Sequence, residues 1–367
     1  MSDGVEPVAD PEPPTQHGGL LGWLRSNLFS TWYNSILTLV LIYVLVTVLV
    51  PLLNWLIFNA DFVGSTQAQC DSGGACWLFL KQRMGFFIYG FYPDEQQWRV
   101  NILFAMLAAC FVPQMIPRFP GRKWLGILGF TVLPVVGFFL VRGGVFGLRF
   151  VPTSLWGGLM LTLVLAYAGM VASLPVGIFL ALGRRSSMPA IRGLSVVFIE
   201  VWRGVPLITV LFMASVMIPL FLPPGVTFDK LLRAFIGITF FWGAYMAEVI
   251  RGGLQAIPKG QYEAAEALGL GYWRKMGLVI LPQALKIVIP GIVNTLIALF
   301  KDTTLVLIIG LFDILGTVQA TIMDPAWSDV TAEAYLFVAF TFWIFTFSLS
   351  RYSQRLEHRL QVGHENE

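Results

Sequence analysis

Charged residues are scarce in this sequence. Asp, Glu, Lys and Arg make up 12% of the 367 residues, about half of the roughly 25% found in soluble domains, while apolar types reach 56%. The mean hydropathy is +0.73. A soluble globule of this length needs far more charge to cover its surface. These values exclude soluble, collagen-like and wholly disordered proteins, and they predict an integral membrane protein.

Residues that bind metals are also few. Three cysteines and three histidines provide little material for a structural metal site, and His17, His358 and His364 all lie near the ends of the chain. The net charge of +3 is too small to indicate a nucleic-acid partner. We therefore expect neither a metal centre nor a nucleic-acid interface.

Several catalytic motifs are missing. No segment reads G-x-x-x-x-G-K-[ST], so the chain is not expected to bind or hydrolyse ATP by itself. H-E-x-x-H and G-x-S-x-G are also absent, which argues against a membrane-embedded hydrolase. The expectation is a protein that is not an enzyme and has no cofactor of its own.

Long uncharged stretches predict eight transmembrane helices. Each supplies about the 17–25 residues that a helix needs to cross roughly 30 Å of hydrocarbon, and their continuous hydropathy argues against strands. Six stretches contain no charge, and they lie between Arg25 and Asp61, Arg99 and Arg118, Lys123 and Arg142, Arg149 and Arg184, Arg203 and Asp229, and Glu333 and Arg351. Two more, about 231–256 and 285–312, are interrupted by charge, the first at Glu248 and Arg251 and the second at Lys301 and Asp302. The predicted fold class is an all-α integral membrane protein.

The basic residues predict the orientation. If both termini lie in the cytoplasm, most of the Lys and Arg residues fall on the cytoplasmic side. Residues 1–30 begin with an acidic, Pro- and Gly-rich segment, which predicts a disordered cytoplasmic tail and not a cleaved signal peptide. Residues 60–98 form the one sizeable outside loop. Its Cys70 and Cys76 form either a small disulfide ring, if the compartment is oxidising, or two free thiols.

The longest cytoplasmic loop, residues 258–282, has a distinctive pattern. Residues 261–268 are strong helix formers, and Gly269 is suited to the position that closes a helix. Acidic residues at its start, with Arg274 and Lys275 after its end, match the helix dipole. The alanines form a thin face that fits a groove on another protein. The alternative is an ordinary surface helix.

This loop resembles the signature of membrane subunits of ABC importers. That signature reads EAA, three residues, G, nine residues, I, one residue, LP. The matching residues are Glu263, Ala264, Ala265, Gly269, Val279, Leu281 and Pro282, with Val279 in place of Ile. In that family the loop forms a coupling helix that docks into the ATPase subunit. The resemblance therefore implies that these residues contact a separate ATPase, which binds ATP and magnesium.

The resemblance extends over about residues 150–357. Segments 157–166, 198–207, 247–253 and 301–305 look like the polar amino-acid uptake branch. The likeness is greatest to the larger permease subunit of the general L-amino-acid importers, which carries three extra spans ahead of a five-span core. It implies a type I importer core at 151–357, an N-terminal extension at 31–150 and a C-terminal tail at 358–367.

Two adjacent charges are predicted to lie deep in the membrane. Lys301 and Asp302 follow the uncharged residues 287–300, which span about 21 Å as a helix. Adjacent side chains on a helix point about 100° apart, so these two cannot simply pair with each other. Each is expected to meet another helix, another subunit or the substrate. An amino acid carries both signs of charge and suits such a path, while an ion-pair lock is the alternative.

Other polar residues in the spans are candidates for gating or for the substrate path. Glu200 with Arg203, and Glu248 with Arg251, have the i, i+3 spacing that allows intrahelical pairs, which favours a structural or gating role. The remaining candidates are hydroxyls and one further carboxylate: Thr162, Thr303, Thr304 and Asp313. Threonine commonly bonds its own helix backbone, and Asp313 is equally suited to a solvated helix end.

The resemblance implies a function and a set of partners. It implies a permease subunit of an ATP-driven amino-acid importer, in the inner membrane, working with two ATPase copies, a periplasmic amino-acid-binding protein and a second related permease, as a heterodimer in preference to a homodimer. The alternatives are an ion-coupled secondary amino-acid transporter, which leaves the 258–282 loop without a role, and a membrane scaffold, which leaves the buried charges unexplained.

Overall fold

The computed structural model describes residues 19–116, 119–223, 225 and 228–362, and every regular element within these ranges is a helix. Six helices are long and apolar enough to cross a membrane, and two further pairs of bent helices bring the number to eight within the described residues. The predicted all-α membrane fold is therefore confirmed. Contacts divide the chain into two units, residues 1–78 and 79–367.

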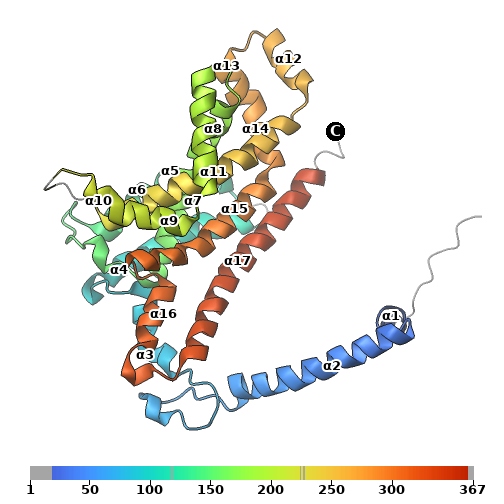
Figure 1. Ribbon diagram of the computed structural model, residues 1–367, viewed down its shortest axis with the longest axis vertical. Helices are drawn as coiled ribbons and strands as arrows, with labels where there is room; N and C mark the ends of the chain where they lie inside the picture. Colours follow the sequence, from blue (N-terminus) through green and yellow to red (C-terminus); the bar gives the residue numbers. More distant parts are fainter. Residues whose placement is uncertain (1–18, 117–118, 224, 226–227, 363–367) are drawn as a thin grey trace, which may run out of the picture. The chain divides into compact units, whose positions relative to one another are not determined.

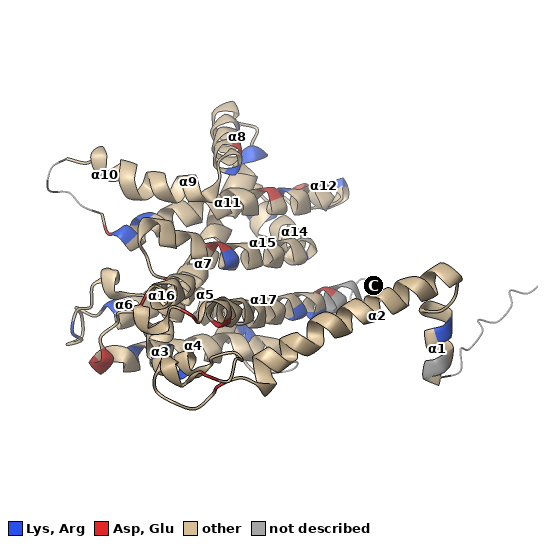
Figure 2. Ribbon diagram, turned by 60° about the horizontal axis from the view of Figure 1, so that its bottom comes forward, with Lys and Arg blue, Asp and Glu red and all other residues tan. Residues whose placement is uncertain are grey.

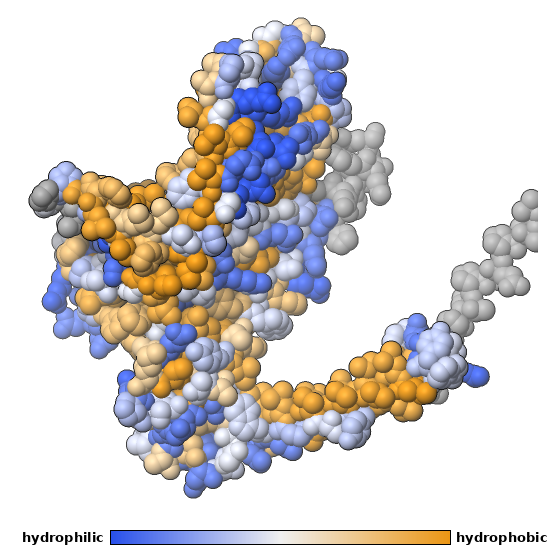
Figure 3. Space-filling model, viewed as in Figure 1, coloured by the Kyte–Doolittle hydropathy of each residue, from blue (hydrophilic) through white to orange (hydrophobic). Residues whose placement is uncertain are grey.

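The first unit consists mainly of two helices, α1 (Gly19–Asn27) and α2 (Trp32–Leu53), followed by a π-helical turn, η1 (Asn54–Phe58), and a 3-10 turn, η2 (Gln67–Gln69). Figure 3 shows α2 as an almost continuous hydrophobic surface. The predicted tail 1–30 is wrong for α1, because the acidic, Pro-rich composition ends before Gly19 and an apolar run follows. Residues 1–18 of that tail lie outside the described residues.

The end of the first unit is a cross-linked loop. Cys70 and Cys76 are joined by a disulfide with a Cα–Cα distance of 5.6 Å. The backbone N–H of Asp61 donates to the carbonyl of Ala75 (2.9 Å), and that of Trp77 donates to the carbonyl of Asp61 (2.9 Å). These bonds hold the two ends of the loop together.

The second unit begins with helices that precede the predicted core. They are α3 (Leu78–Tyr89), η3 (Asp94–Gln96), α4 (Gln97–Met115), α5 (Arg122–Thr131) and α6 (Leu133–Arg142). Helices α5 and α6 meet at an angle of 51° and form one of the bent pairs. The segment 60–98, predicted as an outside loop, contains the helix α3, whose apolar side chains Phe79 and Phe87 are fully buried.

The rest of the second unit contains the longest helices. The elements are η4 (Thr153–Leu155), α7 (Gly158–Arg184), α8 (Pro189–Gly204), α9 (Leu207–Phe212), η5 (Met213–Met217), α10 (Ile218–Leu220), α11 (Lys230–Ala256), α12 (Lys259–Ala267), α13 (Tyr272–Arg274), η6 (Lys275–Ile280), α14 (Leu281–Ile287), α15 (Ile289–Asp302), η7 (Thr303–Ile309), α16 (Ile314–Ile322), η8 (Pro325–Trp327) and α17 (Thr331–Val362). Helices α12 and α13 lie at one end of this unit and α16 at the other (Figure 1).

The predicted span between Arg203 and Asp229 is broken in the structure. Helix α8 and the segment α9–α10 meet at 102°. The break falls at Val205, whose backbone is extended, and at Pro206. Proline has no N–H to continue the helix and disfavours helical backbone at the preceding residue, so the chain turns here. Helix α9 contains no charged residue (Figure 2).

Helices α7 and α11 form the centre of the second unit. A Cβ added at Gly177 would lie 2.7 Å from the Cβ of Met246, and one at Gly243 would lie 2.6 Å from the Cγ1 of Val176. Glycine is therefore required for this close approach, as is common between membrane helices. Buried side chains of α9 and α15 pack around the same pair and complete the core.

The C-terminal prediction also needs correction. Helix α17 continues to Val362, so residues 358–362 of the expected tail are helical. Residues 363–367 lie outside the described residues. The aromatic residues of α17 extend from the core toward the C-terminal part of the helix. There, Arg351 lies over the ring of Phe347 (5.7 Å).

Candidate functional site

The loop 258–282 contains a short helix with a well-defined end. Gly269 adopts a left-handed backbone (φ +71°) immediately after α12. Its N–H donates to the carbonyl of Glu266 (2.9 Å), and the N–H of Leu270 donates to that of Ala265 (3.2 Å). This pair of bonds is the Schellman motif, which satisfies the last carbonyls of a helix. The predicted closing role of Gly269 is confirmed.

Polar contacts tie α12 to the ends of α7 and α11. The Tyr262 hydroxyl donates to the carbonyl of Leu254 at the end of α11 (3.0 Å). The Arg185 guanidinium donates to the same carbonyl (2.7 Å) and to the Tyr262 hydroxyl (3.0 Å). These contacts link α12 to both central helices. Nothing in the loop's own sequence identifies Arg185 as the partner, because it lies 77 residues away from Tyr262.

Some of the signature residues are buried within the chain, and others are exposed. Ala265 is buried, so it holds α12 against its own chain and is not available to a partner. Leu281 is half-buried, whereas Glu263, Ala264 and Pro282 are exposed. The expected alanine face therefore belongs partly to the interior.

Large apolar side chains stand exposed around α12. Leu268 is 79% exposed, Trp273 70% and Leu278 71%. Exposed apolar residues that cluster near one loop are typical of a protein–protein contact. None of these three was predicted as a contact residue, although each is a large apolar residue of the loop.

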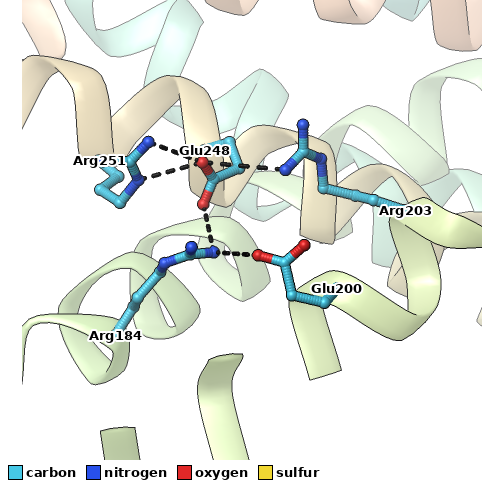
Figure 4. Close-up of polar contacts among 5 residues, drawn as sticks. All are labelled: Arg184, Glu200, Arg203, Glu248 and Arg251. Atoms are coloured by element: carbon cyan, nitrogen blue, oxygen red, sulfur yellow. Dashed lines mark hydrogen bonds and ion pairs between the residues drawn. The ribbon is translucent and has the colours of Figure 1, made fainter. Parts of the chain in front are cut away.

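Five charged side chains from three helices meet near the end of α8 that adjoins its break (Figure 4). Arg184 at the end of α7 donates to Glu248 of α11 (2.8 Å) and to Glu200 of α8 (3.0 Å). Arg251 donates to Glu248 twice (3.0 and 2.8 Å). Arg203 lies 3.8 Å from the same carboxylate. We call these residues, Arg184, Glu200, Arg203, Glu248 and Arg251, the charge cluster.

The charge cluster confirms one expected pair and corrects the other. Glu248 and Arg251 pair along α11 as their spacing allows, whereas the Glu200–Arg203 pair does not form. The reason is that Arg184 and Glu248, from neighbouring helices, offer closer partners. Arg184 was not predicted as a site residue. The sequence indicated only that it lies at the charged end of a predicted span.

Lys301 and Asp302 lie at the end of α15. Lys301 is exposed and Asp302 is half-buried. Neither forms an ion pair or a side-chain hydrogen bond within the part of the chain that the structure describes. An ion-pair lock inside the described chain is thus not seen, and both groups remain available to another subunit or to a ligand.

Thr162 and Asp313 come together, but in the interior. Both are fully buried. The Thr162 hydroxyl donates to the carbonyl of Gly158 (3.2 Å) and accepts from the N–H of Ile314 (3.1 Å), while Asp313 accepts from the N–H of Gly316 (2.9 Å) and caps α16. Burial raises the pKa of the Asp313 carboxyl to about 6, and the Gly316 hydrogen bond opposes that rise. The expectations of a path-lining residue and of a solvated helix end are both wrong for Asp313.

Thr303 is likewise an internal residue. It is buried, and its hydroxyl donates to the carbonyl of Phe300 (2.8 Å). The adjacent Thr304 donates to the carbonyl of Lys301 (2.9 Å). Both hydroxyls thus satisfy their own helix, which is the ordinary role of threonine in a membrane helix.

Comparison with known proteins gives consistent matches. The family model described as binding-protein-dependent transport system inner membrane component matches residues 173–362. The chain is 53% identical over 358 residues to the inner membrane amino-acid ABC transporter permease protein YhdY of Escherichia coli (strain K12), which covers 97% of this chain and 98% of the relative. It is 39% identical over 428 residues to the glutamate/glutamine/aspartate/asparagine transport system permease protein BztC of Rhodobacter capsulatus, which covers 98% of each.

One solved structure is similar over a shorter stretch. It is described as the crystal structure of an amino acid ABC transporter with histidines, and it is 32% identical with a TM-score of 0.48, covering 55% of this chain and 92% of that chain. The family model covers more than half of the sequence, and the two relatives match along almost its whole length. The chain therefore belongs to the family of binding-protein-dependent transport system inner membrane components.

Proposed function

We propose that this chain is the permease subunit of an ATP-driven importer of L-amino acids. Its relatives YhdY and BztC are named as amino-acid transport permeases, and the similarity to both extends through the N-terminal helices as well as the family region. The 258–282 loop matches the coupling signature of such subunits at fixed spacing. Both features support the same role.

The observation that carries this proposal is the exposed apolar surface around α12. Leu268 ends α12, which Gly269 closes and the Tyr262 hydrogen bond holds in place, while Trp273 lies in α13 and Leu278 in η6. All three side chains are exposed. Burying apolar area stabilises a complex by about 25 cal/mol per Å². We propose that the ATPase subunit covers this surface, and that ATP and magnesium bind to that partner.

The contacts of two adjacent arginines suggest how the signal reaches the membrane helices. Arg185 binds Tyr262 of α12, while Arg184 binds Glu200 and Glu248 in the charge cluster. Movement of α12 therefore pulls on the residue next to Arg184. We propose that this displacement loosens the charge cluster and allows α8 to separate from α11, which opens the path on one side.

The proposed substrate path involves Lys301 and Asp302. An amino acid carries an ammonium and a carboxylate, and these two side chains offer one charge of each sign at the end of α15. A buried or half-buried charge in a membrane helix is costly, so it is retained where it serves a path or a partner. We place these residues at the path and not Thr162, Thr303 or Asp313, which have no exposed surface.

Inner membrane components of this family work together with other subunits. We propose two ATPase copies, a second related permease that makes a heterodimer, and a periplasmic amino-acid-binding protein that delivers the substrate. The bias of Lys and Arg supports cytoplasmic termini in the inner membrane, with the 258–282 loop on the same side. An ion-coupled transporter has no feature in its favour, because it leaves this loop without a role.

A co-purification experiment tests the docking surface. The tagged chain is purified from its native membranes in mild detergent, and the ATPase is measured in the eluate. Wild type is expected to retain the ATPase, whereas Leu268→Glu loses most of it because a charge replaces an exposed apolar contact. The matched control is Met323→Glu, which changes a residue that is 80% exposed at the end of α16.

The outcomes distinguish a failure of the docking surface from a failure of the proposed function. Retention of the ATPase by Met323→Glu and loss by Leu268→Glu support docking through α12. If Leu268→Glu and wild type hold the ATPase equally, this surface is not the docking site. Absence of any ATPase from the wild-type complex overturns the proposed function itself.

A further inference from the structure

A cavity of about 480 Å³ lies in the second unit between α4 and α6 on one side and α7 and α11 on the other. This volume is within the roughly 300–1,000 Å³ of small-molecule sites. Neither the charge cluster nor the 258–282 loop contributes to its lining. Val135, Phe139 and Leu232 line it and are 56%, 41% and 42% exposed, so the cavity opens onto the outer surface of these membrane helices.

Most of the cavity wall is apolar. Side chains from four helices supply it, among them Leu103, Leu107, Val164 and Ala168. The neighbouring α4 and α7 are both membrane spans. A cavity of this kind, open to the hydrocarbon, is suited to an acyl chain and not to a polar solute.

Three polar residues of the lining gather at one place. The N–H of Val151 donates to the carbonyl of Arg142 (2.8 Å), which brings the end of α6 next to η4. In η4, the Thr153 hydroxyl donates to the Asp229 carboxylate. Arg142, Thr153 and Asp229 all line the cavity, so a cationic and an anionic side chain lie at the same region of its wall.

Two polar groups of this region have no hydrogen-bond partner within the described residues. The Arg142 guanidinium lies over the rings of Phe138 (5.6 Å) and Phe150 (5.4 Å), and it has no ion pair or hydrogen bond within the described residues. Trp156 lines the cavity and is 1% exposed, and its indole N–H has no partner in the same part of the chain. The Arg142 guanidinium is exposed and unpaired, so it is available to an anionic group of an occupant.

We propose that this cavity binds one phosphatidylethanolamine molecule. Arg142 binds the phosphate through its planar set of donors, and Asp229 accepts from the primary ammonium. One acyl chain fills the space beside Leu107 and Ala168. The lipid thus joins the N-terminal helices of this unit to α7 and α11.

The pair of opposite charges selects among head groups. Phosphatidylcholine has no N–H to donate to Asp229, because its nitrogen is fully methylated. Phosphatidylglycerol has no ammonium, and its net negative charge is repelled by Asp229. The head-group hydroxyls of phosphatidylglycerol donate only neutral hydrogen bonds. Phosphatidylethanolamine alone of these three supplies both an anion to Arg142 and a cationic N–H donor to Asp229.

The test measures lipid retained by the purified permease complex. The complex is incubated with equal amounts of phosphatidylethanolamine, phosphatidylcholine and phosphatidylglycerol with identical acyl chains, and bound lipid is measured by native mass spectrometry. Wild type is expected to retain phosphatidylethanolamine about tenfold over the other two, and Arg142→Gln loses that preference. The matched control is Arg149→Gln, an exposed arginine of the same loop that does not line the cavity.

Two further variants test the two ends of the site. Asp229→Asn keeps the side-chain cap on the N–H of Leu232 (3.1 Å) and removes the charge, so it is expected to equalise phosphatidylethanolamine and phosphatidylcholine. Ala168→Phe fills the apolar part and is expected to abolish retention of all three lipids without lowering the melting temperature of the lipid-free complex. Equal retention of the three lipids by wild type, no bound lipid in wild type, or unchanged binding in Arg142→Gln overturns the proposal.

Discussion

Glu248 is the residue on which arginines from three helices converge. It accepts hydrogen bonds from Arg184 and Arg251 and lies 3.8 Å from Arg203. Its side chain is 16% exposed, while Glu200, the other acid of the charge cluster, is 56% exposed. The cluster therefore depends mainly on one carboxylate. Because three cations share it, removing its charge leaves more unpaired charge than removing that of Glu200.

Glu248→Gln is expected to lower amino-acid uptake at least about tenfold and to destabilise the complex by on the order of 1–3 kcal/mol. Glutamine keeps the shape of the side chain but cannot balance the arginines. Glu200→Gln is the control, with an expected cost of about 0–1 kcal/mol because its pair is largely exposed. Uptake by reconstituted complexes and melting temperature are the measurements. Equal effects of the two variants contradict a central role for Glu248.

Asp313 gives a prediction for pH. Burial raises its pKa to about 6 from the ordinary value of 3.8, so the folded state disfavours the charged form. Its stabilising contribution is complete below about pH 4 and is lost as the pH rises through 6, which amounts to at most about 3 kcal/mol. Asp313→Asn keeps the cap on Gly316 and removes this titration.

The expected result is a gain in melting temperature of Asp313→Asn over wild type that is larger at pH 7.5 than at pH 4.5. Tryptophan fluorescence during heating in detergent measures it. Using the difference between the two proteins removes the titration of all other groups. A difference that stays constant over this range shows that the carboxyl does not titrate between the two pH values.

At the scale of the elements, the end of α12 depends on one residue with a left-handed backbone. Gly269 has φ +71°, and a Cβ added there meets nothing within 4 Å. The cost of a side chain at this position is therefore conformational and not steric with the rest of the protein. Gly260 lies within the same helix and is equally open, but it has a helical backbone.

Gly269→Ala is expected to fray the end of α12 at a cost of about 1 kcal/mol, which lowers ATPase retention several-fold. Gly260→Ala is expected to strengthen the helix by about 0.5–1 kcal/mol and to leave retention unchanged or higher. The ATPase content of the purified complex is the measurement. If both substitutions act alike, the left-handed end of the helix does not determine docking.

At the scale of the whole molecule, the second unit contains the family region and all of the features proposed for transport. The 258–282 loop, the charge cluster and Lys301 lie within residues 79–367. In the proposed function, a partner binds ATP and the energy enters at α12, whereas in an ion-coupled transporter it comes from a gradient across the membrane. The two energy sources make opposite predictions for uptake.

We expect uptake by the reconstituted complex to require ATP on the side of the ATPase and to continue after ionophores have abolished proton and sodium gradients. The physical reason is that α12 is bonded to the ends of α7 and α11, so closure of the ATPases acts on these helices directly. Vesicles without ATP are the control. Loss of uptake on addition of ionophore, with ATP present, contradicts an ATP-driven mechanism.

Several features could be predicted from the sequence because they depend on neighbouring residues. The length of an uncharged run decides whether a helix crosses the hydrocarbon, so most of the spans were predictable, although the chain bends by 102° at the start of the run after Arg203. The closure of α12 by Gly269 follows from the backbone freedom of glycine, and the Glu248–Arg251 pair follows from helical spacing. The resemblance of the 258–282 loop also rests on fixed spacing along the chain.

Other features depend on which helices pack together, and only the tertiary structure decided them. Arg184 meets Glu248 across 64 residues, and Asp313 becomes buried because α16 packs beside the start of α7. The cavity lined by Arg142 and Asp229 exists only between helices that are distant in sequence. Hydropathy identifies which segments enter the membrane, but it is nearly the same for every apolar face. The choice of neighbours is made by close packing and by the pairing of buried charges, which no local pattern contains.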